Sequence, residues 1–176
     1  MRLFVALPCP DPFIDALAPA MEGGPPGLRW VPEEQVHCTL RFVGEVGRHQ
    51  AEDIAEMLSA IEVPAIDSRI DGVGTFTQRR GGALWARLGP RAPLEALHDK
   101  IDRAIQRCGL PPEGRAYLPH VTLARWSGGP LDTRPWTERW AGLTSEVVRF
   151  DRFELVESRL YRDGPVHDTR LTVPLR

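Results

Sequence analysis

A four-residue pattern occurs twice in this chain of 176 residues, as His37-Cys38-Thr39-Leu40 and as His120-Val121-Thr122-Leu123, one copy in each half. Both copies lie in strand-like runs, at residues 36–43 and 118–126. Because side chains alternate along a strand, the histidine and threonine of each copy share one face and the apolar residues share the other. The repeat therefore predicts two strands that each bury one face and present an imidazole beside a hydroxyl on the opposite face.

Many short elements are expected along the chain, because it contains 16 Gly and 17 Pro. The further predicted strands are residues 2–7, 69–76, 83–88, 146–150, 153–160 and 166–174. Helices are predicted after Asp11, over residues 54–61 and over residues 94–108, where apolar residues recur at intervals of three and four. Strands and helices mix without strict alternation, which favours an α+β fold in a single domain of residues 1–176.

Composition excludes several classes of protein. A net charge of -2 rules out a polybasic arm as the basis of nucleic-acid binding. The three cysteines contain no C-x-x-C pair, so neither a disulfide framework nor a zinc knuckle is predicted, and the five histidines show no spacing typical of a metal site. The apolar stretch at residues 3–10 is too short to span a membrane. We expect a cytoplasmic protein without membrane attachment, metal or other cofactor.

The paired motifs suit phosphoester chemistry. Two imidazoles on opposite sides of a phosphorus atom can remove a proton from the attacking oxygen and donate one to the leaving oxygen. Imidazole has an ordinary pKa of about 6.5, so both protonation states are available near neutral pH. The hydroxyls of Thr39 and Thr122 can donate hydrogen bonds to the non-bridging oxygens, where negative charge develops. A cyclic phosphodiester fits this arrangement, and no metal is required.

The sequence around the motifs resembles the two-histidine phosphoesterase superfamily, and within it the bacterial and archaeal RNA 2′,3′-cyclic phosphodiesterases, also called 2′-5′ RNA ligases. The resemblance covers nearly the whole chain. The matching segments are Arg2-Leu3-Phe4-Val5-Ala6-Leu7-Pro8, Trp30-Val31-Pro32, His37 to Val46, Leu84-Trp85-Ala86, Pro119 to Arg125, Glu157-Ser158 and Pro174-Leu175. The chain departs from the family at Cys38, where members often carry a larger apolar residue, and at His167, where many carry a tyrosine.

The resemblance implies a fold of two pseudo-symmetric lobes with antiparallel sheets around a central cleft, one motif in each lobe. It implies hydrolysis of RNA or nucleoside 2′,3′-cyclic phosphates to 2′-phosphates, with ATP-independent 2′-5′ ligation as the reverse reaction. It makes His37 the proton donor, His120 the proton acceptor, and Thr39, Thr122 and Arg125 the phosphate ligands. The expected partners are RNA 3′ ends or small cyclic nucleotides, and the expected state is a monomer.

Arg125 conflicts with the simple strand pattern, because strict alternation places it on the face opposite His120. A twist, a β-bulge or the end of the strand would bring it back to the histidine face. Arg41 shares the face of His37 by the same counting and could assist there, although exposure to solvent is its default.

Other residues are interpreted as structural. The thiol of Cys38 is expected in the core, and the His-x-Thr at His167 is expected to begin a late strand without a role in the site. His49 and His98 lie on predicted helices and are expected at the surface. Trp85, Tyr117 and Trp126 could stack on a nucleobase, but aromatic core is the favoured interpretation.

Two alternative functions stay open. The chain could be a non-catalytic module that binds RNA ends or nucleotides. It could also act on another substrate of the superfamily, such as ADP-ribose cyclic phosphate or 2′-5′ oligoadenylate.

Overall fold

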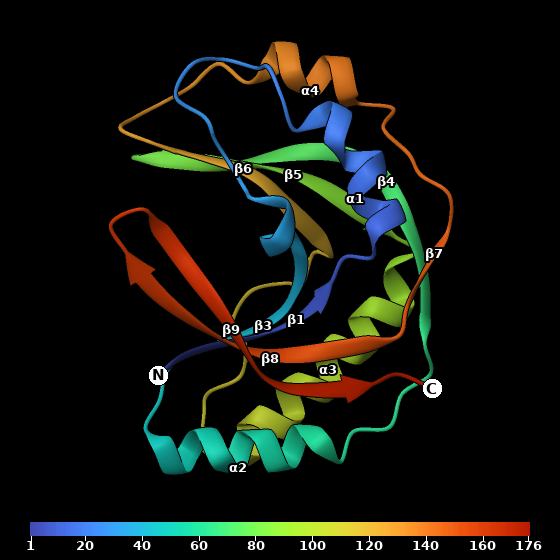
Figure 1. The fold of residues 1–176 in the computed structure, drawn as a ribbon, viewed down its shortest axis with the longest axis vertical. Coiled ribbons are helices and arrows are strands. Elements are labelled where there is room, and N and C mark those ends of the chain that lie inside the picture. The colour runs from blue at the N-terminus through green and yellow to red at the C-terminus, as the bar shows by residue number, and fades with distance from the viewer.

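The computed structural model describes residues 1–176 and has the α+β architecture that the sequence predicts (Figure 1). The helices are α1 (Asp11–Leu17), α2 (Arg48–Ser59), α3 (Arg91–Arg107) and α4 (Arg134–Trp140), with 3₁₀ turns η1 (Ala18–Ala20) and η2 (Glu33–Gln35). The strands are β1 (Arg2–Pro8), β2 (Arg29–Trp30), β3 (His37–Glu45), β4 (Ile66–Gln78), β5 (Gly81–Gly89), β6 (His120–Ser127), β7 (Val148–Phe150), β8 (Arg152–Tyr161) and β9 (Gly164–Pro174). Every predicted strand and helix is present. The two-residue strand β2 and the short helix α4 were not predicted.

All strands pair in antiparallel fashion in the order β7-β4-β5-β6-β3-β1-β8-β9, and β2 adds to β6. The strands β3 and β6 share only one residue pair, Cys38 with Val121, whereas the strands on either side pair over many residues. The sheet therefore has two halves joined at one point. In Figure 1, β4, β5 and β6 lie with α1 and α4 in the upper part, and β1, β3, β8 and β9 lie with α2 and α3 in the lower part.

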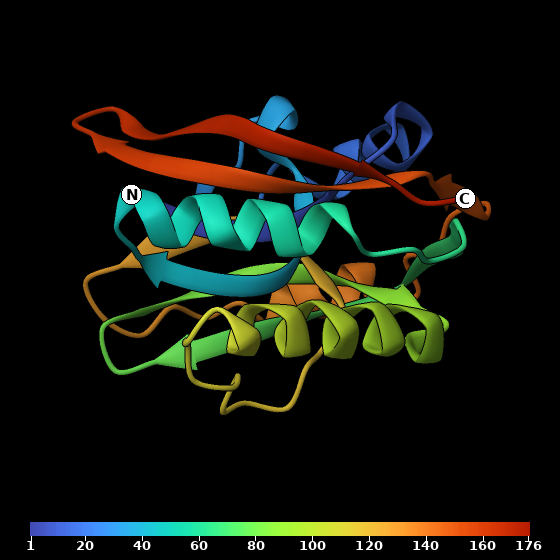
Figure 2. The ribbon, with the colours of Figure 1, turned by 90° about the horizontal axis from the view of Figure 1, so that it is seen from below.

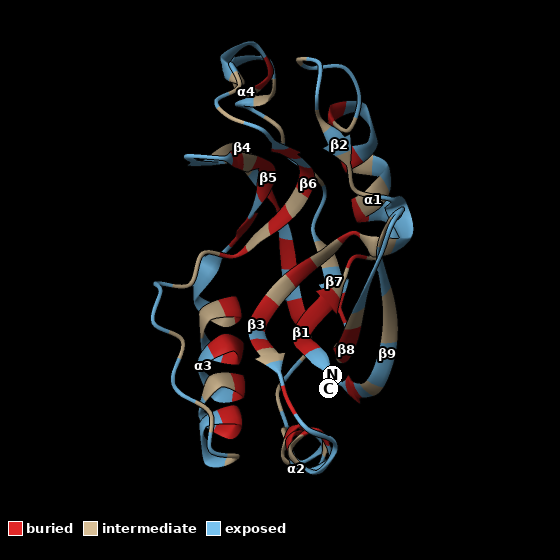
Figure 3. Cartoon of the chain, turned by 90° about the vertical axis from the view of Figure 1, so that its left-hand side faces the viewer, coloured by how far each residue is buried: buried red, intermediate tan, exposed pale blue.

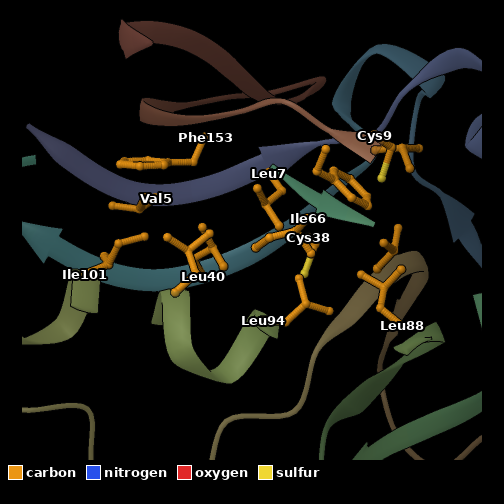
Figure 4. Close-up of a cluster of buried hydrophobic side chains, with 14 of the residues drawn as sticks. Val5, Leu7, Cys9, Cys38, Leu40, Ile66, Leu88, Leu94, Ile101 and Phe153 are labelled. Carbon is orange, nitrogen blue, oxygen red and sulfur yellow. The ribbon is translucent and has the colours of Figure 1, made fainter. Parts of the chain in front are cut away.

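The main core lies between the sheet and helix α3. Leu94 and Ile101 are fully buried on α3, and they pack with Cys38 and Leu40 of β3 (Figure 4). Figure 3 shows that the buried side of α3 is turned toward β3 and β1. Helix α2 lies beside α3, as Figure 2 shows from below. These contacts fix the apolar face of β3, which leaves its other face available for His37 and Thr39.

His98 corrects one expectation of the sequence analysis. Its side chain is 7% exposed, because it faces β3 rather than solvent. The ring stacks on Tyr117 with centroids 4.2 Å apart, and Nδ1 donates a hydrogen bond to the carbonyl of Leu40 at 2.6 Å. An imidazole can be buried at low cost when a carbonyl satisfies its donor. The expectation for His49 is confirmed, since its side chain is 99% exposed.

In the hairpin of β4 and β5, a glycine leaves space for the large ring of a tryptophan on the neighbouring strand. Gly74 pairs with Trp85, and a Cβ atom at Gly74 would lie 2.4 Å from the indole ring. Trp85 in turn pairs with Thr122 of β6. The absence of a side chain at Gly74 therefore sets how close this indole lies to the second motif.

No helix of the chain is long and apolar enough to cross a membrane.

We predict that Gly74→Ala lowers the free energy of unfolding by about 1–3 kcal/mol, because the added methyl group forces the Trp85 ring to move. Gly114→Ala is the matched control, since nothing lies within 4 Å of the point that its Cβ atom would occupy. In urea titrations the control should keep its unfolding free energy or gain up to about 1 kcal/mol. Equal stability of the two variants would contradict this account of the hairpin.

Candidate active site

The two motif histidines have the same local geometry. Each is the first residue of its strand, His37 in β3 and His120 in β6. The Nδ1 atom of His37 is 2.6 Å from the carbonyl of Gln35, and that of His120 is 2.6 Å from the carbonyl of Leu118. A carbonyl can only accept, so Nδ1 carries the proton in both rings and Nε2 of the neutral ring is the free acceptor. The backbone thus fixes the tautomer of each histidine.

The single pairing between the two halves brings the motifs together. Cys38 faces Val121 across the antiparallel strands. Continuing this register by one residue in each direction places His37 across from Thr122, and Thr39 across from His120. All four side chains are half-buried, and neither threonine hydroxyl makes a hydrogen bond within the chain. The arrangement leaves two imidazoles and two unpaired hydroxyls on one face of the sheet.

A β-bulge in β6 brings Arg125 to the same face. Thr122 pairs with Trp85, but the next step along β5 pairs Leu84 with Ala124, so β6 contains one extra residue there. The extra residue reverses the alternation, and Arg125 follows as an exposed residue after two buried neighbours. The bulge thus explains why Arg125 lies on the same face as His120, although strict alternation predicts the opposite face.

The same bulge occurs in β3 and corrects the expectation for Arg41. The pairing with β1 shifts between Thr39 and Arg41, so Arg41 turns to the buried face and Phe42 to the exposed one. Phe42 is 58% exposed and occupies in the first half the place that Arg125 occupies in the second. Arg41 does not share the face of His37.

Arg41 instead connects β3, the strand of the first motif, to helix α3 on the buried face of the sheet. Its guanidinium is 7% exposed and donates from Nε to Asp102 of α3 at 2.5 Å and from Nη2 to the carbonyl of Pro111 at 2.5 Å. A third donor reaches the carbonyl of Phe42. Burial is the largest single effect on the Asp102 carboxyl and raises its pKa, but the hydrogen bonds from Arg41, the Glu113 backbone and Gln106, together with the charge of Arg41, lower it below its ordinary value. This pair ties β3 to α3 directly behind the first motif.

Aromatic side chains support both imidazoles. The ring of His37 stacks on Phe4 with centroids 5.0 Å apart, and His167 of β9 lies edge-on to it at 5.7 Å. His167 lies in a late strand as predicted, but its contact with His37 was not foreseen. In the other half, His120 lies edge-on to Phe76 at 5.0 Å and to Trp85 at 5.9 Å.

The remaining predicted aromatic residues belong to the core, as expected. Trp126 is 4% exposed, Trp85 is 6% exposed, and Tyr117 packs against the main core. Trp85 is thus both a core residue and a neighbour of His120.

Both imidazoles are held neutral near pH 7. The pKa of His37 is lowered to about 4, chiefly by burial, with smaller contributions from the charges of His167, Arg125 and His120 and against the opposing effect of the Gln35 carbonyl. Burial also lowers the pKa of His120, and Arg125 again contributes. Arg125 is therefore close enough for its charge to act on both histidines.

Cys38 is confirmed as a core residue. Its side chain is fully buried, and burial raises the pKa of its thiol to about 11. A thiol of that pKa is protonated near neutral pH and is a poor nucleophile.

Comparison with known proteins gives one consistent family. The family model described as the 2′-5′ RNA ligase superfamily matches residues 9–162. An RNA 2′,3′-cyclic phosphodiesterase of Aeropyrum pernix is 31% identical over 147 residues, which cover 81% of this chain and 83% of the relative. The RNA 2′,3′-cyclic phosphodiesterase of Thermus thermophilus is 31% identical over 183 residues, which cover 95% of this chain and 86% of the relative.

Solved structures support the same fold. A crystal structure of a protein from Thermus thermophilus aligns with a TM-score of 0.80 at 25% identity and covers 100% of this chain and 98% of that one. The apo form of Escherichia coli LigT aligns with a TM-score of 0.77 at 21% identity, over 99% of this chain and 96% of that one.

We predict that Arg125→Gln raises the pKa of both His37 and His120, because the guanidinium charge lowers both in the native protein. The imidazole resonances followed by NMR between pH 3 and 8 give the two midpoints, and that of native His37 should lie near 4. Arg103→Gln, at an exposed position of α3, is the control and should leave both midpoints in place. Unmoved midpoints in Arg125→Gln would show that this side chain lies away from the histidines.

Proposed function

Because the chain belongs to the 2′-5′ RNA ligase superfamily, we propose that it is a phosphodiesterase that hydrolyses 2′,3′-cyclic phosphate ends of RNA to 2′-phosphates. The observation that carries the proposal is the matched pair of imidazoles. Both rings have Nδ1 bonded to their own backbone and Nε2 free, on one face and on opposite halves of the sheet. Acid-base catalysis at phosphorus needs two such groups, one on each side of the phosphorus.

The proton transfers balance as follows. Nε2 of His120 accepts a proton from water as the water oxygen bonds to phosphorus. Nε2 of protonated His37 donates its proton to the 3′ oxygen as the bond from phosphorus to that oxygen breaks. One water is consumed, the product has a 2′-phosphate and a 3′ hydroxyl, and one proton has moved from His37 to His120. The assignment of donor and acceptor follows the family, because the local geometry of the two rings is the same.

Three further side chains are proposed to hold the phosphate. Thr39 and Thr122 donate hydrogen bonds from their free hydroxyls to the non-bridging oxygens, and Arg125 supplies a positive charge. These groups act most strongly as negative charge builds up on the five-coordinate phosphorus. Fixed donors in a half-buried site need little rearrangement at that moment.

Binding of the substrate explains how His37 can act as an acid although its pKa is about 4 in the free protein. A bound phosphate anion favours the protonated form of a nearby imidazole, and it also offsets the charge of Arg125 that lowers this pKa. The pKa of His37 therefore rises when the phosphate binds. The proton donor forms only in the complex.

We predict that His37→Ala and His120→Ala each lower kcat for 2′,3′-cyclic AMP by roughly 10²- to 10⁴-fold, because each removes one partner of the proton transfer. His49→Ala is the control, since its side chain is 99% exposed and lies outside the site. Circular dichroism checks that the variants are folded. A folded His37 or His120 variant with a near-native rate would overturn the mechanism.

The products of 2′,3′-cyclic AMP hydrolysis test the assignment of roles. With His37 as the acid, chromatography should show 2′-AMP, because the bond to the 3′ oxygen breaks. A dominant 3′-AMP would exchange the roles of the two histidines and leave the paired site standing. Tight binding of the cyclic nucleotide without turnover would favour a non-catalytic module.

A further inference from the structure

An unpaired arginine lies beside Arg125, beyond the proposed catalytic groups. The short strand β2 pairs with β6, and in this pairing Arg29 is directly opposite Arg125. Directly opposed residues of antiparallel strands point to the same face, so Arg29 shares the face of Arg125 and the histidines. Across the sheet, Arg125 also pairs with Ala83 of β5, and Ala83 pairs with Phe76 of β4. Arg29, on β2, is therefore the outermost of these four cross-strand neighbours.

Two like charges in this position disfavour the fold. Opposed like charges across a strand pair are destabilising, and here the positive charge of Arg29 lowers the pKa of Arg125, second to the effect of burial. Neither guanidinium is paired with a carboxylate, although other arginines of the chain, such as Arg41 and Arg149, form ion pairs with aspartates. Arg125 is partly surrounded by protein, but both arginines keep side-chain surface exposed to solvent. An anion between or beside them would relieve the repulsion and satisfy both sets of donors.

We propose that Arg29 binds a second phosphate of the substrate, the one that links the terminal nucleotide to the rest of the RNA on its 5′ side. The inference rests on the proposed function, in which the cyclic phosphate is held by the two motifs and Arg125. Arg29 lies at the same position along β6 as Arg125 but one strand farther out, and its charge acts on Arg125 and not on either histidine. It is therefore placed for the next anionic group rather than for the reacting one. It is a specificity residue, which makes an RNA end a better substrate than a nucleoside cyclic phosphate.

A single pair of substrates tests the proposal. One is 2′,3′-cyclic AMP, and the other is the same molecule with a 5′-phosphate, which supplies the second anion without further nucleotides. The native protein should show a higher kcat/KM for the 5′-phosphorylated substrate, roughly tenfold to a hundredfold, as expected for a charge-assisted hydrogen bond. In Arg29→Gln the ratio of kcat/KM between the two substrates should fall to about one, and in Arg29→Lys it should stay between this value and the native one. Arg103→Gln, on α3 behind the sheet, should keep the full ratio.

Salt dependence gives an independent readout. Each lost contact between an arginine and a phosphate reduces the slope of log affinity against log salt by about 0.7 for a single strand. The slope measured for binding of a single-stranded oligoribonucleotide with a 2′-phosphate end should therefore fall by about this amount in Arg29→Gln.

Two kinetic outcomes would overturn the inference while leaving the proposed function intact. One is a ratio that persists in Arg29→Gln. The other is an equal loss on both substrates, which would mean that Arg29 serves the cyclic phosphate instead. If the native protein turns over neither substrate, the proposed function fails, and binding then decides the role of Arg29. Calorimetry should show that adenosine 2′,5′-bisphosphate binds more tightly than 2′-AMP, and only when Arg29 is present. Equal affinities would reject the second phosphate site.

Discussion

The site depends on one contact between the two halves of the sheet, the pairing of Cys38 with Val121. Each strand that carries a motif is otherwise paired within its own half, so this contact sets the register of the two motif strands. The Tyr117 hydroxyl, close to the second motif, also donates a hydrogen bond to the carbonyl of Thr39. It buries one side chain from each strand against the core and leaves the neighbouring histidines and threonines on the other face. Antiparallel pairing then gives each histidine the threonine of the other motif as its neighbour. The contact is small, but α3 packs against β3 behind it and Arg41 of β3 is bonded to Asp102 of α3.

The two halves share their backbone geometry and differ in side chains. Both motif strands begin at the histidine, bond its Nδ1 to the carbonyl two residues earlier, and contain a bulge after the threonine. At the position after the bulge, one half has Arg125 and the other has Phe42, so the face is cationic on one side and apolar on the other. A nucleotide has the same polarity, with anionic phosphates and an aromatic base. This asymmetry gives an otherwise repeated site a direction, and Arg29 extends its cationic side.

The sequence predicts most strands, the three longer helical segments and the shared face of the four motif residues, because strand alternation and helical spacing follow burial directly. The sequence is less informative where a β-bulge inserts one extra residue into a strand, because the side chains after the bulge then lie on the opposite face from the one that alternation predicts. Strict alternation puts Arg41 on the histidine face and Arg125 opposite it, and a bulge in each strand reverses both. The pairing of β2 with β6 joins residues far apart in the chain, so Arg29 has no local signal. The surface placement expected for His98 is wrong because this residue contacts β3, which is distant in sequence. The contact of His167 with His37 also joins distant segments, so it has no local signal either. Two bulges and one long-range strand pair account for most of what sequence reasoning missed.

The central claim is that His37 and His120 act as one unit on a single phosphate. A double-mutant cycle on kcat for 2′,3′-cyclic AMP tests it most directly, with the two single alanine variants and the double variant measured under the same conditions. If the histidines act together, removing either one already breaks the proton transfer, so the double variant should be no more than a few-fold slower than the slower single variant. Losses that multiply in the double variant would show that the two imidazoles act independently and would contradict the paired mechanism.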